Sequence, residues 1–467
     1  MSVAPGSSQS SSPRRAQDEA TLVTTDSLGN PVLLQDRASL SALNDFVEGF
    51  ITCEARAVNI LSVAEHDRSA IVQASCAALH MFAESREGPA NARPFIDAAN
   101  TAVSQANERE QRFVAAVAAW IDGDMARAMA LHDEQARLHP RDLVSLKLGQ
   151  YHRFNVGDTS GMLRLAQAAL PSASDVPQMH GMAAFAFEQC HLLPQAESAA
   201  RTALTMTERE PWAQHALAHV MLTQGRLQEG LQFMQHSSQT WTKLNSFMVT
   251  HNWWHLALFA IDLGDTGLAL QTYDQQVWGV VKSYSQDQIG AVSLLTRLEL
   301  AGIDVGDRWQ DVADHLAPRL NDQVLPFLDL QYLYGLARAD RPETDVLLRN
   351  IESHGRRMAA NGADDATQMW QRVATPAAQG LVAHARGKYQ QALDGLGQAL
   401  PRLLEIGGSH AQRELFEQIH VDALMRSGHW GAAQQLVQQR CNSQPESIRL
   451  GNQARRVYSM LGINTGG

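Results

Sequence analysis

The amino-acid sequence predicts an all-α fold in which tightly paired helices, joined as helix–turn–helix repeats, stack into a curved α-solenoid. From Leu40 onward the chain is rich in Ala, Leu, Gln, Glu and Arg, which are good helix formers. A clean alternation of β-branched residues, the mark of a half-buried strand, is absent. The third observation is that turn residues recur with a period of about 34 residues.

The composition excludes several classes of protein. Of the 467 residues, 45% are hydrophobic, which is too many for a mainly disordered chain. The net charge is −11, and Lys and Arg are scattered apart from short pairs such as Arg14-Arg15, so we expect no nucleic-acid partner. The longest apolar runs, such as Trp253–Ile261, fall far short of the roughly 18 residues of a membrane span, so we expect no membrane partner.

The N-terminus and the cysteines point to a cytoplasmic protein. Residues 1–20 are Ser-rich and lack the apolar segment of a secretory signal, which predicts a disordered tail. The four cysteines lie far apart, with no spacing typical of a metal site or a redox motif: Cys53, Cys76, Cys190 and Cys441. We therefore expect reduced thiols in or beside a helical core.

The repeat period is clearest in the first half of the chain. The turn glycines Gly123 and Gly157 are 34 residues apart, and Gly225 follows after twice that distance. The midpoint of that longer interval is His191, which predicts a turn without a glycine. The positions five residues after these turns, where a tight helix pair needs a small side chain, are Ala128, Met162, Ala196 and Gly230.

The same pattern follows the later turns at Gly264, Gly387 and Gly428. A helix–turn–helix unit with this period is the signature of tetratricopeptide repeats, which bury their apolar faces only by stacking on one another. We therefore predict N-terminal helical repeats over residues 21–275 and C-terminal helical repeats over 376–467. Residues 276–375 do not keep the period, and helices expected over 308–316, 325–339 and 344–358 predict irregular helical pairs at a bend.

Six sequence blocks are distinctive: EPWAQHALAH (210–219), MQHSSQTW (234–241), THNWWHLAL (250–258), GIDVGDRWQDV (302–312), LPFLDLQYL (325–333) and GGSHAQRELF (407–416). In their order and spacing they resemble those of the tetratricopeptide repeat protein 38 family. The resemblance covers about Leu40 to Leu461, and it implies an all-α solenoid with a binding groove but no particular biochemical role. One departure is that His410 and Glu414 stand where Asn and Asp are expected in the last block.

The family of tetratricopeptide repeats also indicates which residues line the groove. In such repeats the residues 13, 10, 6 and 3 places before the turn glycine lie on one face of the first helix and point into the concave surface. This register selects Tyr151, Phe185, Trp212, His215, His219, His251 and Trp254 as candidate ligand-binding residues. The resulting wall is aromatic and histidine-rich, with Lys147 as its one basic residue, which favours an apolar or aromatic ligand or a groove closed by another part of the chain. The alternative is that these aromatic side chains pack against a neighbouring helix.

The histidines offer a candidate metal site. His215 and His219 form one HxxxH pair and His251 and His255 form another on the next first helix, so four imidazoles could converge on a transition metal such as Zn or Fe. Neither pair is HExxH, so the general base of a zinc peptidase is missing. His255 also lies one place off the groove register. Core or hydrogen-bonding histidines and a metal-free acid/base pair remain as alternatives.

The sequence thus predicts a binding protein that holds a small apolar or aromatic ligand, or a peptide or protein segment, in its concave groove. The alternative is an enzyme on the same scaffold that uses the groove histidines, with or without a metal. A third hypothesis is self-association into a homodimer. Whether the four imidazoles converge on one position distinguishes the metal-site hypothesis from the hypothesis of core histidines.

Overall fold

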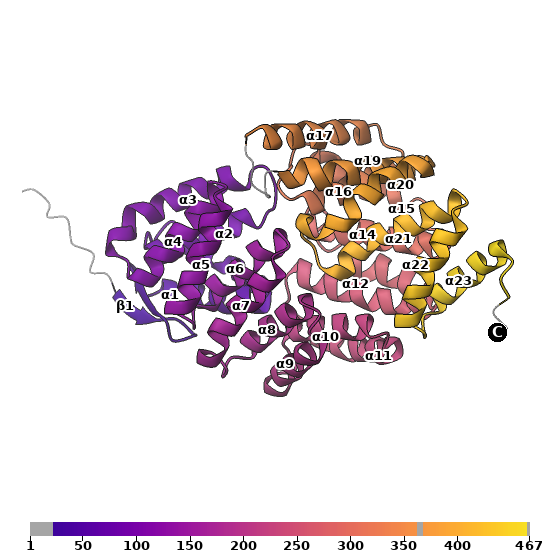
Figure 1. Cartoon of the computed structure of the whole chain (residues 1–467). Helices are drawn as coiled ribbons and strands as arrows, with labels where there is room; N and C mark the ends of the chain where they lie inside the picture. Colours follow the sequence, from indigo (N-terminus) through magenta and orange to yellow (C-terminus); the bar gives the residue numbers. More distant parts are fainter. Residues whose placement is uncertain (1–21, 362–367, 465–467) are drawn as a thin grey trace, which may run out of the picture.

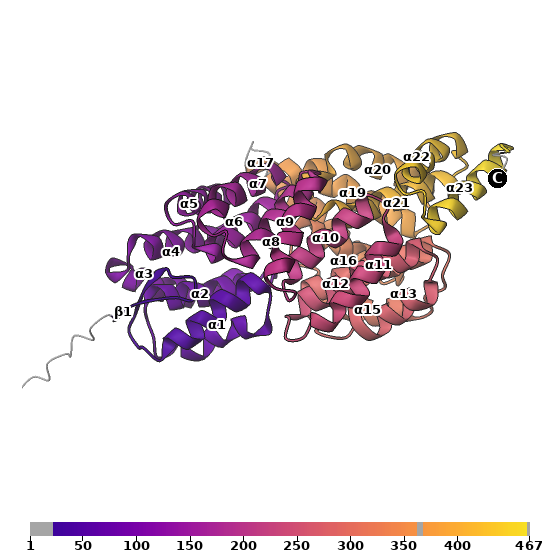
Figure 2. The ribbon, with the colours of Figure 1, turned by 90° about the horizontal axis from the view of Figure 1, so that it is seen from below.

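The computed structural model of the chain describes residues 22–361 and 368–464, and the predicted tail, residues 1–20, lies outside this part. The described chain is an all-α solenoid built of antiparallel helix pairs (Figures 1 and 2), as the sequence predicts. None of the helices in these ranges has both the length and the apolar character that crossing a bilayer requires.

The first half of the solenoid begins with α1 (Ser39–Thr52), the 3₁₀ helix η1 (Ala55–Val63), α2 (Ala70–Met81) and α3 (Gly88–Ala102). Regular pairs follow, and each first helix lies on the inner side of its repeat. The pairs are α4 (Glu108–Ile121) with α5 (Met125–Leu138), α6 (Leu143–Asn155) with α7 (Thr159–Ala169), α8 (Pro177–Gln189) with α9 (Leu193–Met206), α10 (Pro211–Thr223) with α11 (Leu227–Ser237), and α12 (Ser246–Asp262) with α13 (Thr266–Thr272).

The second half contains the helices that break the period. The helix expected over 308–316 is α15 (Arg308–Leu316), and those expected over 325–339 and 344–358 are α16 (Pro326–Arg338) and α17 (Glu343–Asn361). The other helices are α14 (Ser285–Leu300), α19 (Thr375–Ala385), α20 (Tyr389–Ala399), α21 (His410–Arg426), α22 (Trp430–Ser443) and α23 (Ile448–Leu461). A π-helical turn, η7 (Trp370–Ala374), leads into α19, and the 3₁₀ helix η8 (Leu400–Ile406) precedes α21.

The turns within the repeats explain the period. Gly157 has a φ of 72°, and His191 at the predicted midpoint has a φ of 57°, so both adopt the left-handed conformation that ends a helix. Asp158 then caps the second helix, because its carboxylate accepts a hydrogen bond from the backbone N–H of Gly161. At both turns only three residues therefore separate the end of one helix from the start of the next.

The positions five residues after the turns are buried, as the repeat register requires. Ala128 and Ala196 are fully buried, and Met162 is only 1% exposed. At Gly230 the neighbouring helix comes closest, since a Cβ atom there would overlap the ring of Phe259 on α12. The absence of a side chain at Gly230 is therefore what allows α11 and α12 to pack.

A Gly230→Ala variant is expected to unfold at a lower urea concentration, because the added methyl group overpacks the core at a cost of about 1–3 kcal/mol. The matched control is Gly290→Ala in the interior of α14, where a Cβ would meet nothing within 4 Å. That control is expected to be neutral or stabilising by up to about 1 kcal/mol, since alanine is the better helix former. Equal destabilisation of both variants would contradict this packing.

The start of the range expected to be helical differs from the prediction. Strands β1 (Leu22–Thr25) and β2 (Pro31–Leu34) form an antiparallel hairpin in which Leu22 pairs with Leu34. Val32 and Leu34 bury their side chains, and the backbone N–H of Leu33 donates to the Glu110 carboxylate on α4 over 2.9 Å. The hairpin is therefore stabilised by contacts with the repeats.

The C-terminal elements pack against the N-terminal repeats. In Figure 1, α23 lies beside α12, and the two helices are in contact. The Gln444 side chain donates to the carbonyl of Leu222 over 2.8 Å, and Arg449 pairs with Asp262 over 2.8 Å. At Gly225 a Cβ would lie only 2.9 Å from the carbonyl oxygen of Ser443, so this contact depends on glycine. These contacts join the C-terminal elements to the turn-side ends of α10 and α12, and Phe327, Ile406 and Ser409 from the second half of the chain line the cavity on the concave side.

Candidate functional site

An apolar cavity of about 450 Å³ lies on the concave side of the solenoid. This volume is within the range typical of small-molecule sites, about 300–1,000 Å³. Its walls include parts of α1, α6, α8, α10, α12 and α16 and the start of α21. Its apolar lining includes Phe50, Phe82, Tyr151, Phe154, Met182, Phe185, Trp212, Phe247, Phe327 and Ile406.

Two stacked rings form the centre of the aromatic wall. The rings of Phe185 and Trp212 have centroids 5.1 Å apart and an angle of 11° between their planes. The Lys147 ammonium lies 5.2 Å from the centre of the Trp212 ring, a cation–π geometry. Lys147 also donates to the carbonyls of Phe50 and Ile51 at the end of α1, so its charge is held at the cavity wall.

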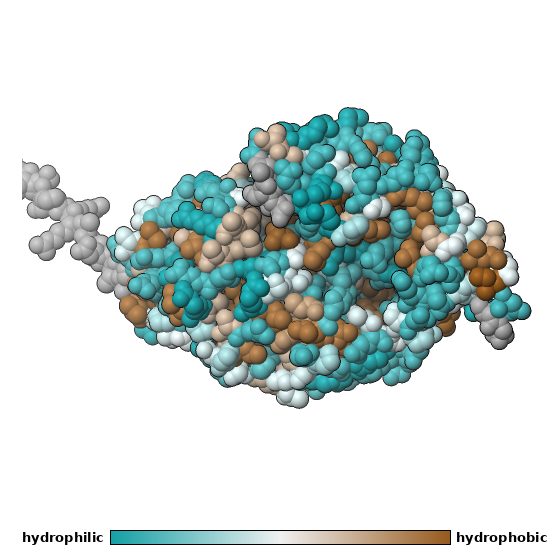
Figure 3. All heavy atoms as spheres, in the orientation of Figure 1, coloured by the Kyte–Doolittle hydropathy of each residue, from teal (hydrophilic) through white to brown (hydrophobic). Residues whose placement is uncertain are grey.

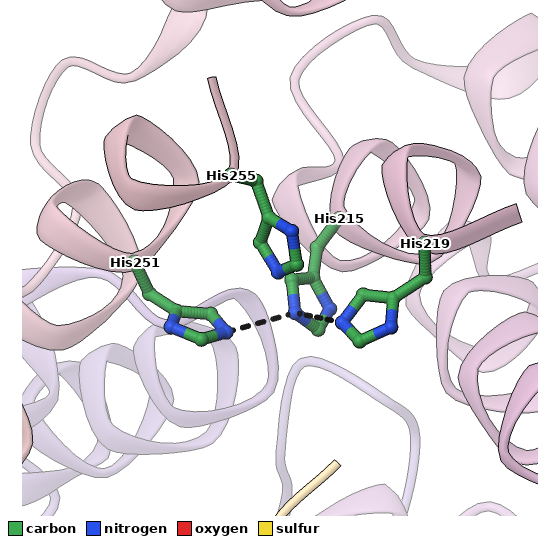
Figure 4. A group of neighbouring side chains, drawn as sticks. All are labelled: His215, His219, His251 and His255. Atoms are coloured by element: carbon green, nitrogen blue, oxygen red, sulfur yellow. Dashed lines mark hydrogen bonds between the residues drawn. The ribbon is translucent and has the colours of Figure 1, made fainter. Parts of the chain in front are cut away.

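His215 and His251 belong to the cavity lining and lead from it into a group of four histidines. Figure 4 shows the rings of His215, His219, His251 and His255 turned toward one another. The Nε2 atom of His215 is 3.1 Å from Nε2 of His219 and 3.1 Å from Nε2 of His251. One nitrogen from each of the four rings can be chosen so that all lie within 4.8 Å of one another.

Several nitrogens of this group have no hydrogen-bond partner in the described part of the chain. They are Nδ1 of His215 and both Nδ1 and Nε2 of His255. His215, His219 and His255 are each at most 1% exposed. A buried polar atom without a partner costs about 1–3 kcal/mol, so the arrangement is unfavourable unless something else satisfies these atoms.

Burial keeps all four imidazoles neutral at pH 7. Burial lowers the pKa of each ring, and the neighbouring imidazoles lower it further for His215 and His255. For His251 burial, together with His219, lowers the pKa to about 3. The nearby Glu188 raises the pKa of His219, but the effect of burial is larger. Neutral imidazoles carry a free lone pair, which is the form that binds metals.

A second group adjoins the first through His219. Nδ1 of His219 is 3.4 Å from an oxygen of the Glu188 carboxylate and 3.5 Å from Nε2 of His410, and His410 itself contacts Glu188. Glu188 is fully buried. Burial alone would raise the pKa of Glu188, but its contacts with His219 and His410 outweigh burial and lower it, so Glu188 is a carboxylate.

A polar cavity, also about 450 Å³ in volume, lies on the other side of these groups. His410 and Arg413 of α21 line it, whereas Ser409 and Gln412 of the same helix line the apolar cavity. The remaining charged lining residues are Asp262, Arg297, Glu414, Glu417, Arg440 and Arg449. The histidines and Glu188 therefore separate an apolar space from a charged one.

The structure places most of the candidate ligand-binding residues together. Tyr151, Phe185, Trp212, His215 and His251 all line the apolar cavity. His219 lies deeper, between His215 and Glu188. His255 joins the group although it is one place off the groove register.

Trp254 differs from the other candidates, because it is not part of the lining of either cavity. It is 1% exposed and stacks on His251, with ring centroids 5.2 Å apart and an angle of 9°. The Arg297 guanidinium of α14 lies 5.1 Å from the centre of its ring. For Trp254 the structure thus corresponds to the alternative in which an aromatic side chain packs against a neighbouring helix.

Sequence reasoning missed His410 and the role of Glu188. Glu188 has a local signal, since it occupies the groove position three residues before the turn at His191. His410 has none: it reaches Glu188 from 222 residues away in the chain. Its position is fixed by the start of α21, where Ser409 and Gln412 form a capping box.

No family model matches the chain. Among solved structures, it is similar to a complex described as the structure of Naa15/Naa10 bound to HypK-THB. The two chains share 11% identity, the alignment covers 92% of this chain and 69% of that one, and the TM-score is 0.24. This level of similarity says nothing about the activity of the present chain.

Proposed function

We propose that this protein binds a small apolar or aromatic molecule in the cavity beside His215 and His251. The observation that carries the proposal is an aromatic-lined space of about 450 Å³ on the closed, concave side of the solenoid. The C-terminal elements cover that side, which favours a small molecule over a long peptide segment. On the resemblance of its sequence blocks, we also propose that the chain belongs to the tetratricopeptide repeat protein 38 family.

The surface offers less for an apolar ligand than the interior does. On the face drawn in Figure 3, hydrophobic residues form separate groups among hydrophilic ones rather than one broad patch. Inside, the stacked rings of Phe185 and Trp212 give a flat apolar wall, and Lys147 and the histidines supply a few polar groups for orientation. An apolar wall with few polar groups is the usual make-up of a small-molecule site. The cytoplasmic location and the homodimer stay predictions.

The test is a titration with N-phenyl-1-naphthylamine, a neutral aromatic probe whose fluorescence increases in apolar surroundings. One probe per chain is expected to bind, and Trp212→Ala is expected to weaken binding at least about tenfold, which is about 1.4 kcal/mol. The matched control is Trp430→Ala, which removes a half-buried tryptophan of α22 that lines neither cavity. Equal affinity in the parent, the Trp212 variant and the control would contradict the proposal.

A second candidate function is an enzyme that acts on the bound molecule. It is favoured by one observation, that the imidazoles of His215 and His251 form part of the cavity wall and so meet the ligand directly. Compounds that bind in the titration would be incubated with the parent and with a His251→Gln variant. Turnover by the parent that the variant lacks, with binding retained, would support the enzyme; binding without turnover would leave the binding function alone.

A further inference from the structure

Two distances within the four-histidine group are close to those between the ligands of a tetrahedral metal site. Zinc–imidazole bonds of about 2.0–2.1 Å imply nitrogens about 3.3–3.4 Å apart at the corners of a tetrahedron. The two Nε2–Nε2 distances at His215 are both 3.1 Å, close to this value. The four ligands come as two i, i+4 pairs, from one turn of α10 and one turn of α12.

Hydrogen bonding alone does not account for these contacts. A neutral imidazole has one N–H and one lone pair, so Nε2 of His215 has either one proton to donate or one lone pair to accept with. It nevertheless faces two nitrogens at equal distance. A cation at the centre resolves this, because every ring can then direct a lone pair toward it. The cation would also be a partner for a ring nitrogen of His255, and neither nitrogen of that ring has a hydrogen-bond partner among the described residues.

Glu188 lies where a metal site often has a carboxylate that orients one of its histidine ligands. Its carboxylate lies 3.4 Å from Nδ1 of His219, the nitrogen on the side of the ring away from His215. An N–H on Nδ1 that points to a carboxylate places the lone pair on Nε2, toward the other imidazoles. Carboxylates that orient metal-binding histidines in this way are a regular part of zinc sites. The buried negative charge of Glu188 would also partly balance a divalent cation.

We propose that His215, His219, His251 and His255 bind one divalent transition-metal ion, with Glu188 as the positioning residue of His219. Four imidazole nitrogens suit Zn²⁺, Cu²⁺, Ni²⁺ or Fe²⁺ and do not suit Mg²⁺ or Ca²⁺, which prefer oxygen ligands. The ion joins α10 to α12 at the wall of the apolar cavity. The site stands on its own geometry and does not depend on the ligand proposed for the cavity.

The test uses Co²⁺ and the tag-free protein after removal of metal with a chelator. Four-coordinate Co²⁺ absorbs strongly in the visible, so a titration reports both stoichiometry and geometry. One Co²⁺ per chain with this absorption is expected, and Zn²⁺ is expected to displace it while Mg²⁺ does not. His215→Ala and His255→Ala are expected to lose the absorption. The control is His152→Ala, which is expected to keep the absorption. His152 is a buried histidine of α6 outside the group, and its ring contacts Trp120 of α4 and His132 of α5.

A Glu188→Gln variant separates the positioning role from the ligands. It is expected to keep one Co²⁺ per chain and to bind it about 10–100-fold more weakly. Circular dichroism checks that each variant remains helical. If the histidine variants fail to fold, the Co²⁺ spectrum of the parent and the Co²⁺ affinity of Glu188→Gln still test the proposal. A parent without stoichiometric four-coordinate Co²⁺, or histidine variants that fold and bind Co²⁺ as the parent does, would overturn the proposal. Unchanged affinity in Glu188→Gln would overturn the role of Glu188.

Discussion

Replacing Trp254 with alanine is expected to lower the free energy of unfolding by about 3–5 kcal/mol. The indole is 1% exposed and sits between His251, on which it stacks, and the guanidinium of Arg297. Its removal leaves a cavity in a densely packed region, where the neighbours cannot collapse fully. Urea denaturation followed by circular dichroism measures the effect.

Trp212→Ala is the informative comparison, because it removes the same side chain from a different environment. Trp212 is half-buried and already borders the apolar cavity, so its truncation enlarges an existing space. We expect a clearly smaller loss of stability than for Trp254 and a larger loss of probe affinity. A Trp212 variant that is destabilised as strongly as the Trp254 variant, with unchanged probe binding, would mean that both tryptophans are core residues.

Replacing Arg109 with methionine is also expected to destabilise the protein by about 3–5 kcal/mol, because it leaves a buried carboxylate without its partner. Arg109 donates to Asp142 over 2.9 Å, and the two residues are only 5% and 4% exposed. The same guanidinium donates to the carbonyl of Pro31 over 3.2 Å. The variant therefore weakens both the repeat and the attachment of the β-hairpin, which is measurable by urea denaturation.

The control is the double variant Arg109→Met/Asp142→Asn, which removes both charges. The introduced asparagine would keep the N-cap of α6, where Asp142 accepts from the backbone N–H of Ser145. The double variant is expected to recover most of the lost stability, since a buried ion pair is often replaceable by neutral groups. A double variant as unstable as the single one would show that the loss arises from packing and not from the unpaired charge.

The repeat architecture could be predicted because short stretches of sequence determine it. A left-handed turn and a small residue five positions later recur along the chain, and both are requirements of one helix pair. The period alone predicts a turn even at His191, which lacks the usual glycine, and the φ of 57° at this residue confirms the turn. The hairpin could not be predicted in this way, because its strands have four residues each and depend on side chains such as Glu110, far along the chain.

The candidate site could be predicted only as far as the register reaches. The register predicts that Trp212, His215 and His251 line the groove, and they line the cavity because they share the inner face of successive helices. It failed at Trp254, since α14 packs against α12 and Arg297 covers the ring. The repeat register also could not predict the position of His410. This residue contacts Glu188 only because the C-terminal part of the solenoid packs against the N-terminal repeats.

The most direct test of the central claim, that an aromatic-walled ligand cavity lies beside four converging imidazoles that bind a metal ion, is a crystal structure with Co²⁺ and N-phenyl-1-naphthylamine bound. Data collected at the cobalt absorption edge locate the ion independently of the rest of the electron density. We expect one anomalous peak about 2.0–2.2 Å from a nitrogen of each of the four histidines, and the probe against Phe185 and Trp212. Imidazoles turned away from one another, with the probe outside the cavity, would contradict the account.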